Sequence, residues 1–168
     1  EDIRGSVAHA SMLGEEGIID PDVAAGLVRS LGEILEEWRK GAFQATDRHD
    51  DVHMAVEARL MEKLGPTGGA LHTARSRNDQ IATDLRLWLR RQIREVDSAL
   101  VAFIEVLLDR VEADCEILIP GFTHLQRGQP ILLGHHFLAH AWALSRDRDR
   151  LAGALKRVDR SPLGACAM

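Results

Sequence analysis

The chain has 168 residues, 45% of them hydrophobic and 28% charged, which suffices for one or two modest domains with a hydrophobic core. Its formal net charge of −5, with both signs interspersed, argues against a basic surface that would bind a nucleic-acid backbone. The most apolar stretch, residues 99–108, contains Glu105 and is too short to span a bilayer, and no segment resembles a signal peptide.

Amphipathic patterns predict two helices in the first part of the chain. Asp20-Pro21-Asp22 supplies an N-cap and a first-turn proline, and apolar residues then recur at helical spacing over residues 23–38, until Gly41. A second helix is predicted over residues 52–64, after the acidic pair Asp50-Asp51, whose charge suits a helix N-terminus.

A loop and a long helix are predicted next. Residues 65–73 contain three glycines and a proline, a composition typical of a loop that can adopt positive φ. Ser76 and Asp79 then resemble a capping box. From there an approximate seven-residue apolar repeat predicts about 35 residues, or about 50 Å, of helix, and a helix of that length needs packing partners.

The remainder of the chain predicts a short connection and another long helix. Pro120-Gly121 breaks the repeat, and a helix is predicted from Gln129-Pro130 to near Arg160, with only residues 116–119 suggesting extended backbone. Aromatic residues make up only 4% and no segment shows sustained period-two alternation, so the prediction is an all-α fold. The predicted domains are a small helical N-terminal domain, residues 1–75, and the start of a long-helix bundle, residues 76–168.

Two clusters of polar residues lie in the breaks between helices. The first, residues 72–80, reads His-Thr-Ala-Arg-Ser-Arg-Asn-Asp-Gln at the start of the long helix. Free backbone N–H groups, the helix dipole and an arginine there would suit a carboxylate ligand. The alternative is that Ser76 and Asp79 only cap the helix while the arginines are solvated.

The second cluster, residues 121–126, places His124 beside the hydroxyl of Thr123. A histidine in a short loop between long helices can transfer protons near neutral pH. The alternative is a hydrogen-bonded structural histidine in a turn.

No metal site is predicted. His135, His136 and His140 lie at helical spacing, but no carboxylate or cysteine accompanies them at ligand spacing, so helix packing is the preferred interpretation. Cys115 and Cys166 lie far apart and form no CxxC pattern, which argues against a disulfide framework and indicates a reducing, cytoplasmic location.

Five segments resemble signature sequences of the argininosuccinate lyases and their near relatives, the δ-crystallins. These segments are Arg4-Gly5-Ser6, Asp51-Val52-His53, residues 71–84, residues 120–131 and Pro162-Leu163-Gly164-Ala165. Agreement at so many separated places favours a functional interpretation of both polar clusters.

The resemblance implies a helical lyase that assembles as a homotetramer, with active sites built from three subunits. It implies reversible cleavage of the carbon–nitrogen bond of argininosuccinate, giving arginine and fumarate for arginine biosynthesis, without a metal or organic cofactor. A base removes a proton next to a carboxylate, an aci-carboxylate carbanion forms, and an acid helps the guanidino nitrogen leave.

Roles for individual residues follow from the same resemblance. Thr123 and His124 match the family's catalytic pair, and His53 and His72 match motif positions with supporting roles. The residues that match substrate-binding positions are Ser6, Ser76, Arg77, Asn78, Thr123 and Gln126.

The sequence departs from the family pattern at two positions, Phe122 in place of Tyr and Gly128 in place of Ala, which we expect to alter packing more than chemistry. The family's Gly-Ser-Ser-x-Met-Pro-x-Lys-x-Asn loop, whose serine is the favoured base, would follow Met168. We therefore expect these residues to be an inactive N-terminal part of a longer enzyme. The alternatives are a sibling lyase that releases fumarate from adenylosuccinate, aspartate or malate, and a crystallin-like structural homologue.

Overall fold

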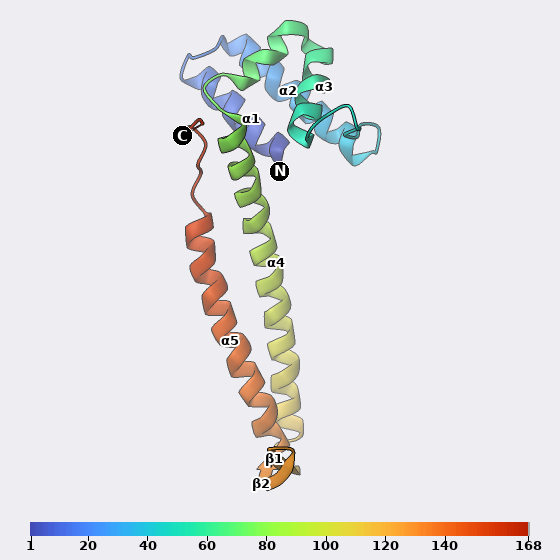
Figure 1. Cartoon of the computed structure of the whole chain (residues 1–168), viewed down its shortest axis with the longest axis vertical. Coiled ribbons are helices and arrows are strands. Elements are labelled where there is room, and N and C mark those ends of the chain that lie inside the picture. Colours follow the sequence, from blue (N-terminus) through green and yellow to red (C-terminus); the bar gives the residue numbers. More distant parts are fainter. Residues whose placement is uncertain (168) are drawn as a thin grey trace. The chain divides into compact units, whose positions relative to one another are not determined.

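The computed structural model describes residues 1–167, which form two compact units (Figure 1). The first unit comprises residues 1–88 and the segment that starts at Ser161, and the second comprises residues 89–160. Most described residues are helical, so the prediction of a helical fold is confirmed.

Three helices begin the first unit: α1 (Asp2–Glu15), α2 (Pro21–Arg39) and α3 (Val52–Leu64). The Asp20 carboxylate caps α2 by accepting from the backbone N–H of Asp22 at 2.8 Å. Asp51 caps α3 in the same way, accepting from Met54 N–H at 2.6 Å. Both predicted helices are therefore confirmed, together with the acidic residues predicted at their N-termini.

The core of the first unit lies between these helices and a 3-10 helix, η1 (Gly65–His72). Burial of each large aliphatic side chain there contributes about 2 kcal/mol. The prediction of a loop over residues 65–73 was wrong. Gly65 does adopt positive φ, 61°, but Pro66 fixes a helical φ at the next position and the chain winds on as a 3-10 helix. The buried core residues are Ile3, Ala10, Leu27, Leu31, Ile34, Val56, Leu60 and Leu71.

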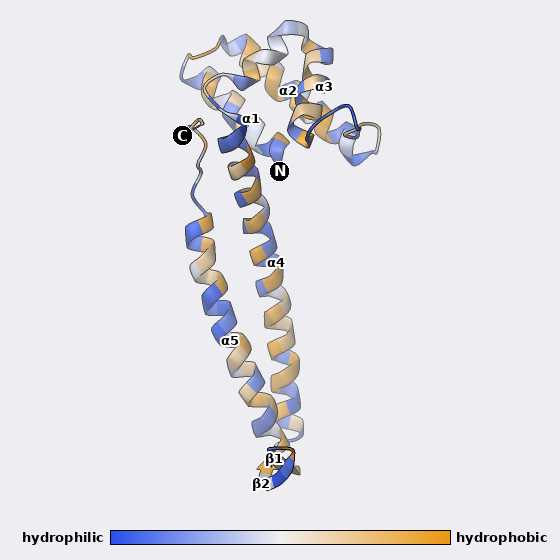
Figure 2. Cartoon of the chain, in the orientation of Figure 1, coloured by the Kyte–Doolittle hydropathy of each residue, from blue (hydrophilic) through white to orange (hydrophobic). Residues whose placement is uncertain are grey.

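The predicted long helix is confirmed as α4 (Arg77–Ala113), 37 residues that begin in the first unit and end in the second. In the second unit, α5 (Leu133–Val158) runs beside α4, and Arg148 Nε donates to Asp97 Oδ1 at 2.7 Å between them. Apolar residues occur along the length of α4 (Figure 2). The side chains of Val96, Phe103 and Val106 are among those that remain exposed. No helix within residues 1–167 combines the length and apolar character needed to cross a membrane.

An antiparallel hairpin joins α4 to α5, where the sequence predicted only a short loop. Its strands are β1 (Leu118–Thr123) and β2 (Gln126–Leu132), with a bulge between Gly121 and Phe122. The predicted second long helix is confirmed as α5, but it begins at Leu133 and not at Gln129, because Pro130 lies in β2 opposite Pro120. Proline has no N–H, and the paired prolines occupy positions that need no ladder hydrogen bond.

Candidate functional site

The first polar cluster is held at the N-terminus of α4 by a reciprocal cap. Ser76 N–H donates to Asp79 Oδ1 at 3.0 Å, and Asn78 N–H donates to Ser76 Oγ at 3.2 Å. Asn78 is exposed, and Ser76 and Arg77 are partly buried. The capping interpretation is thus correct for the Ser76 and Asp79 side chains, and it leaves the roles of Arg77 and Asn78 open.

The second oxygen of the Asp79 carboxylate binds a segment far along the chain. Asp79 Oδ2 accepts from Gly164 N–H at 3.1 Å and from Cys166 N–H at 2.8 Å. Burial opposes ionisation of Asp79, but the backbone donors around it outweigh that effect and lower its pKa. The cluster is therefore anchored to residues 164–166, which belong to the same unit.

Arg77 is hydrogen-bonded to two neighbours, and its Nε also lies 3.6 Å from Asp51 Oδ2. Its Nη2 donates to Glu57 Oε2 and its Nη1 to Gln80 Oε1, both at 2.7 Å. The other oxygen of Glu57 lies 2.9 Å from His72 Nδ1, so one α3 carboxylate contacts two of the predicted site residues. Sequence reasoning missed Glu57, although it lies one helical turn beyond His53 and hence on the same face of α3.

A buried polar group lies behind Arg77. Asp2 Oδ1 lies 2.8 Å from His53 Nδ1 and accepts from Gln80 Nε2 at 2.7 Å. Burial raises the pKa of Asp2, but the contacts with His53 and Gln80 outweigh it, and the net pKa lies below the ordinary value. The contact with Asp2 is also the main reason why the pKa of His53 is raised. His53 is thus a buried partner of Asp2, which the sequence did not single out.

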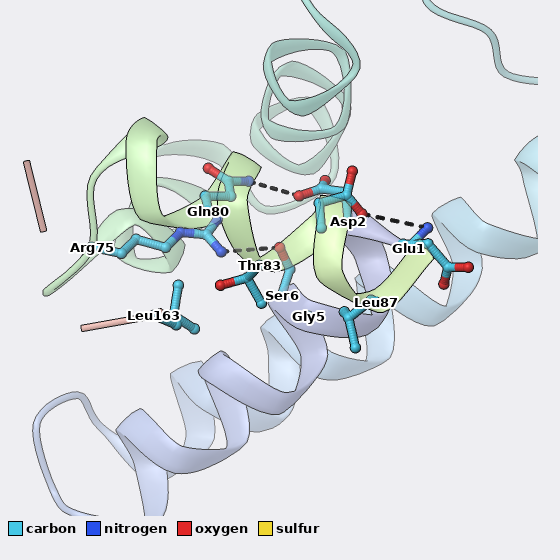
Figure 3. Close-up of a pocket in the computed structure, with 10 residues that line it drawn as sticks. Glu1, Asp2, Gly5, Ser6, Arg75, Gln80, Thr83, Leu87 and Leu163 are labelled. Carbon is cyan, nitrogen blue, oxygen red and sulfur yellow. Dashed lines mark hydrogen bonds and ion pairs between the residues drawn. The ribbon is translucent and has the colours of Figure 1, made fainter. Parts of the chain in front are cut away.

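Ser6 is nearly inaccessible, with 1% of its surface exposed, and its Oγ accepts from Arg75 Nη1 at 3.1 Å (Figure 3). Both residues line a small pocket in the first unit. Burial lowers the pKa of Arg75, whose Nε and Nη2 have no hydrogen-bond partner within residues 1–167. A direct substrate contact by Ser6 stays a prediction, since in this chain its hydroxyl contacts Arg75.

The second polar cluster forms the tip of the hairpin in the second unit. Thr123 pairs with Gln126, and the two residues between them, His124 and Leu125, have φ values of 50° and 62°. Such a two-residue turn favours Asn and Gly, and a leucine in this conformation is strained. All four side chains are exposed, Leu125 at 98%. Strain at an exposed turn is compatible with a functional role for the His124 side chain.

The two departures from the family pattern lie on the same hairpin. Phe122 is 61% exposed and lines an open hollow on β1 and β2. A methyl group at Gly128 would meet Gly121 O at 3.5 Å, an ordinary contact, so the space there accepts alanine.

The predicted site residues divide between the two units. Ser6, His53, His72, Ser76, Arg77 and Asn78 belong to the first unit, and Thr123, His124 and Gln126 to the second. The polar residues that sequence reasoning passed over, Asp2, Glu57 and Arg75, all contact residues of the first set. Nothing in the local sequence indicates that Asp2 and His53 form a pair, because their contact joins α1 to α3.

The chain is similar to curated argininosuccinate lyases. It is 54% identical over 168 residues to an argininosuccinate lyase of Prochlorococcus marinus (strain MIT 9211), covering all of this chain and 36% of that protein. It is 50% identical over 167 residues to an argininosuccinate lyase of Neisseria meningitidis, covering 99% and 36%. The chain thus spans little more than a third of the length of these curated relatives.

Solved structures show the same fold. EDDS lyase in complex with formate is 28% identical with a TM-score of 0.88, covering 99% of this chain and 32% of that one. A fumarate lyase:delta crystallin of Brucella melitensis has a TM-score of 0.83 at 22% identity, covering 99% and 43%. The helical fold is therefore that of a class of lyases. A family model described as "Lyase" matches residues 1–168, and the chain belongs to that family.

Proposed function

We propose that this chain is part of an argininosuccinate lyase, which cleaves argininosuccinate reversibly to arginine and fumarate in arginine biosynthesis. The observation that carries the proposal is the 54% identity over 168 residues to an argininosuccinate lyase, against 28% to EDDS lyase. A structure of an EDDS lyase variant holds bound fumarate, which supports fumarate as a product of a lyase with this fold.

Substrate carboxylates would bind at the N-terminus of α4. Arg77 offers a guanidinium that is partly exposed, Asn78 is exposed, and Ser76 lies at the positive end of the helix dipole. Gln126 would be a further substrate-binding residue. Ser6 would contribute through its hydrogen bond with Arg75. An incoming carboxylate can take the place of Glu57 on Arg77, because Glu57 keeps His72 as a second partner.

Proton transfer would involve the hairpin tip. His124 is exposed beside Thr123, so it can meet the departing guanidino nitrogen or hold a proton during the elimination. The base that abstracts the succinyl proton is assigned to the family's serine-rich loop, which the 168 residues do not contain. The 168 residues alone would therefore be inactive.

The complete enzyme would be a homotetramer in the cytoplasm, with active sites shared between subunits. Exposed apolar residues of the second unit support assembly, since helices with such surfaces need partners; Trp142 on α5 is 61% exposed. Cys115 and Cys166 are free thiols, as expected in a reducing compartment. We further propose the domain boundary near residue 75, just before α4.

The test uses the full-length protein, with fumarate release followed by ultraviolet absorbance. Release from argininosuccinate but not from adenylosuccinate, aspartate or malate would support the proposal. Release from one of the other substrates alone would identify a sibling lyase instead. A folded tetramer that releases fumarate from none of them would indicate a crystallin-like protein.

A further inference from the structure

A continuous path of side-chain contacts leads from a buried carboxylate to the partly buried Arg77 of the candidate site. Gln80 stands in the middle of this path: its Nε2 donates to Asp2 Oδ1 at 2.7 Å, and its Oε1 accepts from Arg77 Nη1 at 2.7 Å. Figure 3 shows the Gln80 amide pointing at Asp2. Asp2 and Gln80 are 7% and 4% exposed, so water hardly competes for these bonds.

The buried carboxylate determines which end of the Gln80 amide faces Arg77. An ionised carboxylate only accepts hydrogen bonds, so Asp2 must receive the NH2 group of Gln80. The carbonyl oxygen is then turned the other way, toward the guanidinium. His53, 2.8 Å from Asp2 Oδ1, stabilises the ionised form of Asp2. Asp2, which only accepts, and the Arg77 guanidinium, which only donates, therefore require the same orientation of the Gln80 amide.

Gln80 and Glu57 together fix the plane of the guanidinium, because they bind different terminal nitrogens. They differ in charge. Glu57 neutralises Arg77 and must give way to an anionic ligand, whereas the neutral amide of Gln80 can stay in place and leave the positive charge available. A planar guanidinium held at one terminal nitrogen presents the other nitrogens in a defined direction.

We propose that Gln80, oriented by Asp2, is a positioning residue that holds the Arg77 guanidinium ready for a substrate carboxylate. This inference rests on the proposed function of Arg77 as a carboxylate-binding residue. It adds Gln80 and Asp2 to the site as residues that act through Arg77 and contact no substrate.

The kinetic test is a double-mutant cycle in the full-length enzyme. Gln80→Leu keeps the approximate size of the side chain and removes both hydrogen bonds, so KM for argininosuccinate should rise about tenfold with little change in kcat. In an Arg77→Ala background, Gln80→Leu should change KM no further. Equal effects in both backgrounds, or no effect in either, would overturn the proposal.

The matched control is Gln92→Leu on the same helix. Gln92 Nε2 donates to Glu95 Oε2 at 2.9 Å, and neither residue belongs to the path. This variant should keep the KM of the unmodified enzyme. If Gln80→Leu does not fold, Asp2→Asn replaces it in the cycle: the Gln80 amide loses its charged acceptor and is held less firmly, so KM should rise only when Arg77 is present.

A second measurement requires no turnover. Phenylglyoxal modification of Arg77, located by peptide mass spectrometry, should be several-fold faster in Gln80→Leu than in Gln92→Leu, because a guanidinium nitrogen loses its partner. Equal labelling rates would overturn the positioning role. Faster labelling in a protein that does not cleave argininosuccinate would leave the positioning role standing while the proposed function fails.

Discussion

His53 Nδ1 lies 2.8 Å from Asp2 Oδ1, and both side chains are 6% exposed, so an ion pair joins α3 to α1 inside the first unit. The pair stabilises the fold and, through Gln80, reaches the candidate site.

The stability of the fold should depend on pH through this pair. The pKa of His53 is raised above 6.5, so its contribution is complete below 6.5 and is lost as pH rises through the folded-state pKa. The pKa of Asp2 is lowered below 3.8, so its contribution is lost as pH falls through that lower value. The contribution of the pair is therefore largest between pH 3.8 and 6.5.

Urea titrations of Asp2→Asn at several pH values measure this contribution. The apparent free energy of unfolding should fall by about 2 kcal/mol in that window, the usual cost of losing a buried hydrogen bond to a charged group. The loss should shrink once His53 is neutral. His140→Asn, at an exposed position on α5, serves as the control, and a loss independent of pH would contradict the prediction.

A second buried histidine, His9, should change the pH dependence of stability in the opposite direction. His9 Nε2 donates to Thr73 O at 2.8 Å, and burial lowers the pKa of His9 below 6.5. The unfolded state then binds a proton first, so stability is lost as pH falls below 6.5. His9→Gln should cost about 1 kcal/mol at neutral pH through the hydrogen bond. It should also flatten the acid side of the stability curve, and an unchanged acid slope would refute this role of His9.

Removal of the Asp79 carboxylate should destabilise both the N-terminus of α4 and the backbone at residues 164–166. Asp79→Ala takes away the cap on Ser76 N–H and the acceptor for Gly164 and Cys166, and should cost about 2 kcal/mol. Hydrogen exchange should accelerate at the amides of residues 164 and 166. Asp20→Ala, which removes the cap of α2, should destabilise the protein without accelerating exchange at these two amides.

Substitution of the hairpin histidine should affect chemistry rather than folding. His124→Asn should lower turnover of the full-length enzyme by about two to four orders of magnitude, as loss of acid–base help does. Asparagine tolerates the positive φ of 50° at this position, so the melting temperature should hardly change. A turnover close to that of the unmodified enzyme would remove His124 from the mechanism.

Local signals predicted the helices well and the hairpin poorly. Asp20 and Asp51 precede α2 and α3, and the apolar repeat of α4 needs only its own sequence to be recognised. The hairpin has no such pattern: prolines lie in both strands, and His124-Leu125 is an unusual pair for a two-residue turn. Its strands form because they pair with each other.

The candidate site was predictable only where its residues lie together in sequence. The run from His72 to Gln80 identified Arg77 and the cap, but the contact of Arg75 with Ser6 joins positions 69 residues apart. The contact of Gln80 with Asp2 spans 78 residues. Such pairs depend on how α1 packs against the start of α4, which spacing along the chain does not encode.

The two oxygens of Asp79 also imply an order of events during synthesis. Oδ1 can bind Ser76 N–H as soon as the first turn of α4 has formed, whereas the donors for Oδ2 lie 85 and 87 residues later. In a nascent chain that has only just completed α4, Asp79 Oδ2 therefore has neither of these two backbone donors. The surroundings of Arg77 acquire their final anchoring only after the ribosome has translated Cys166.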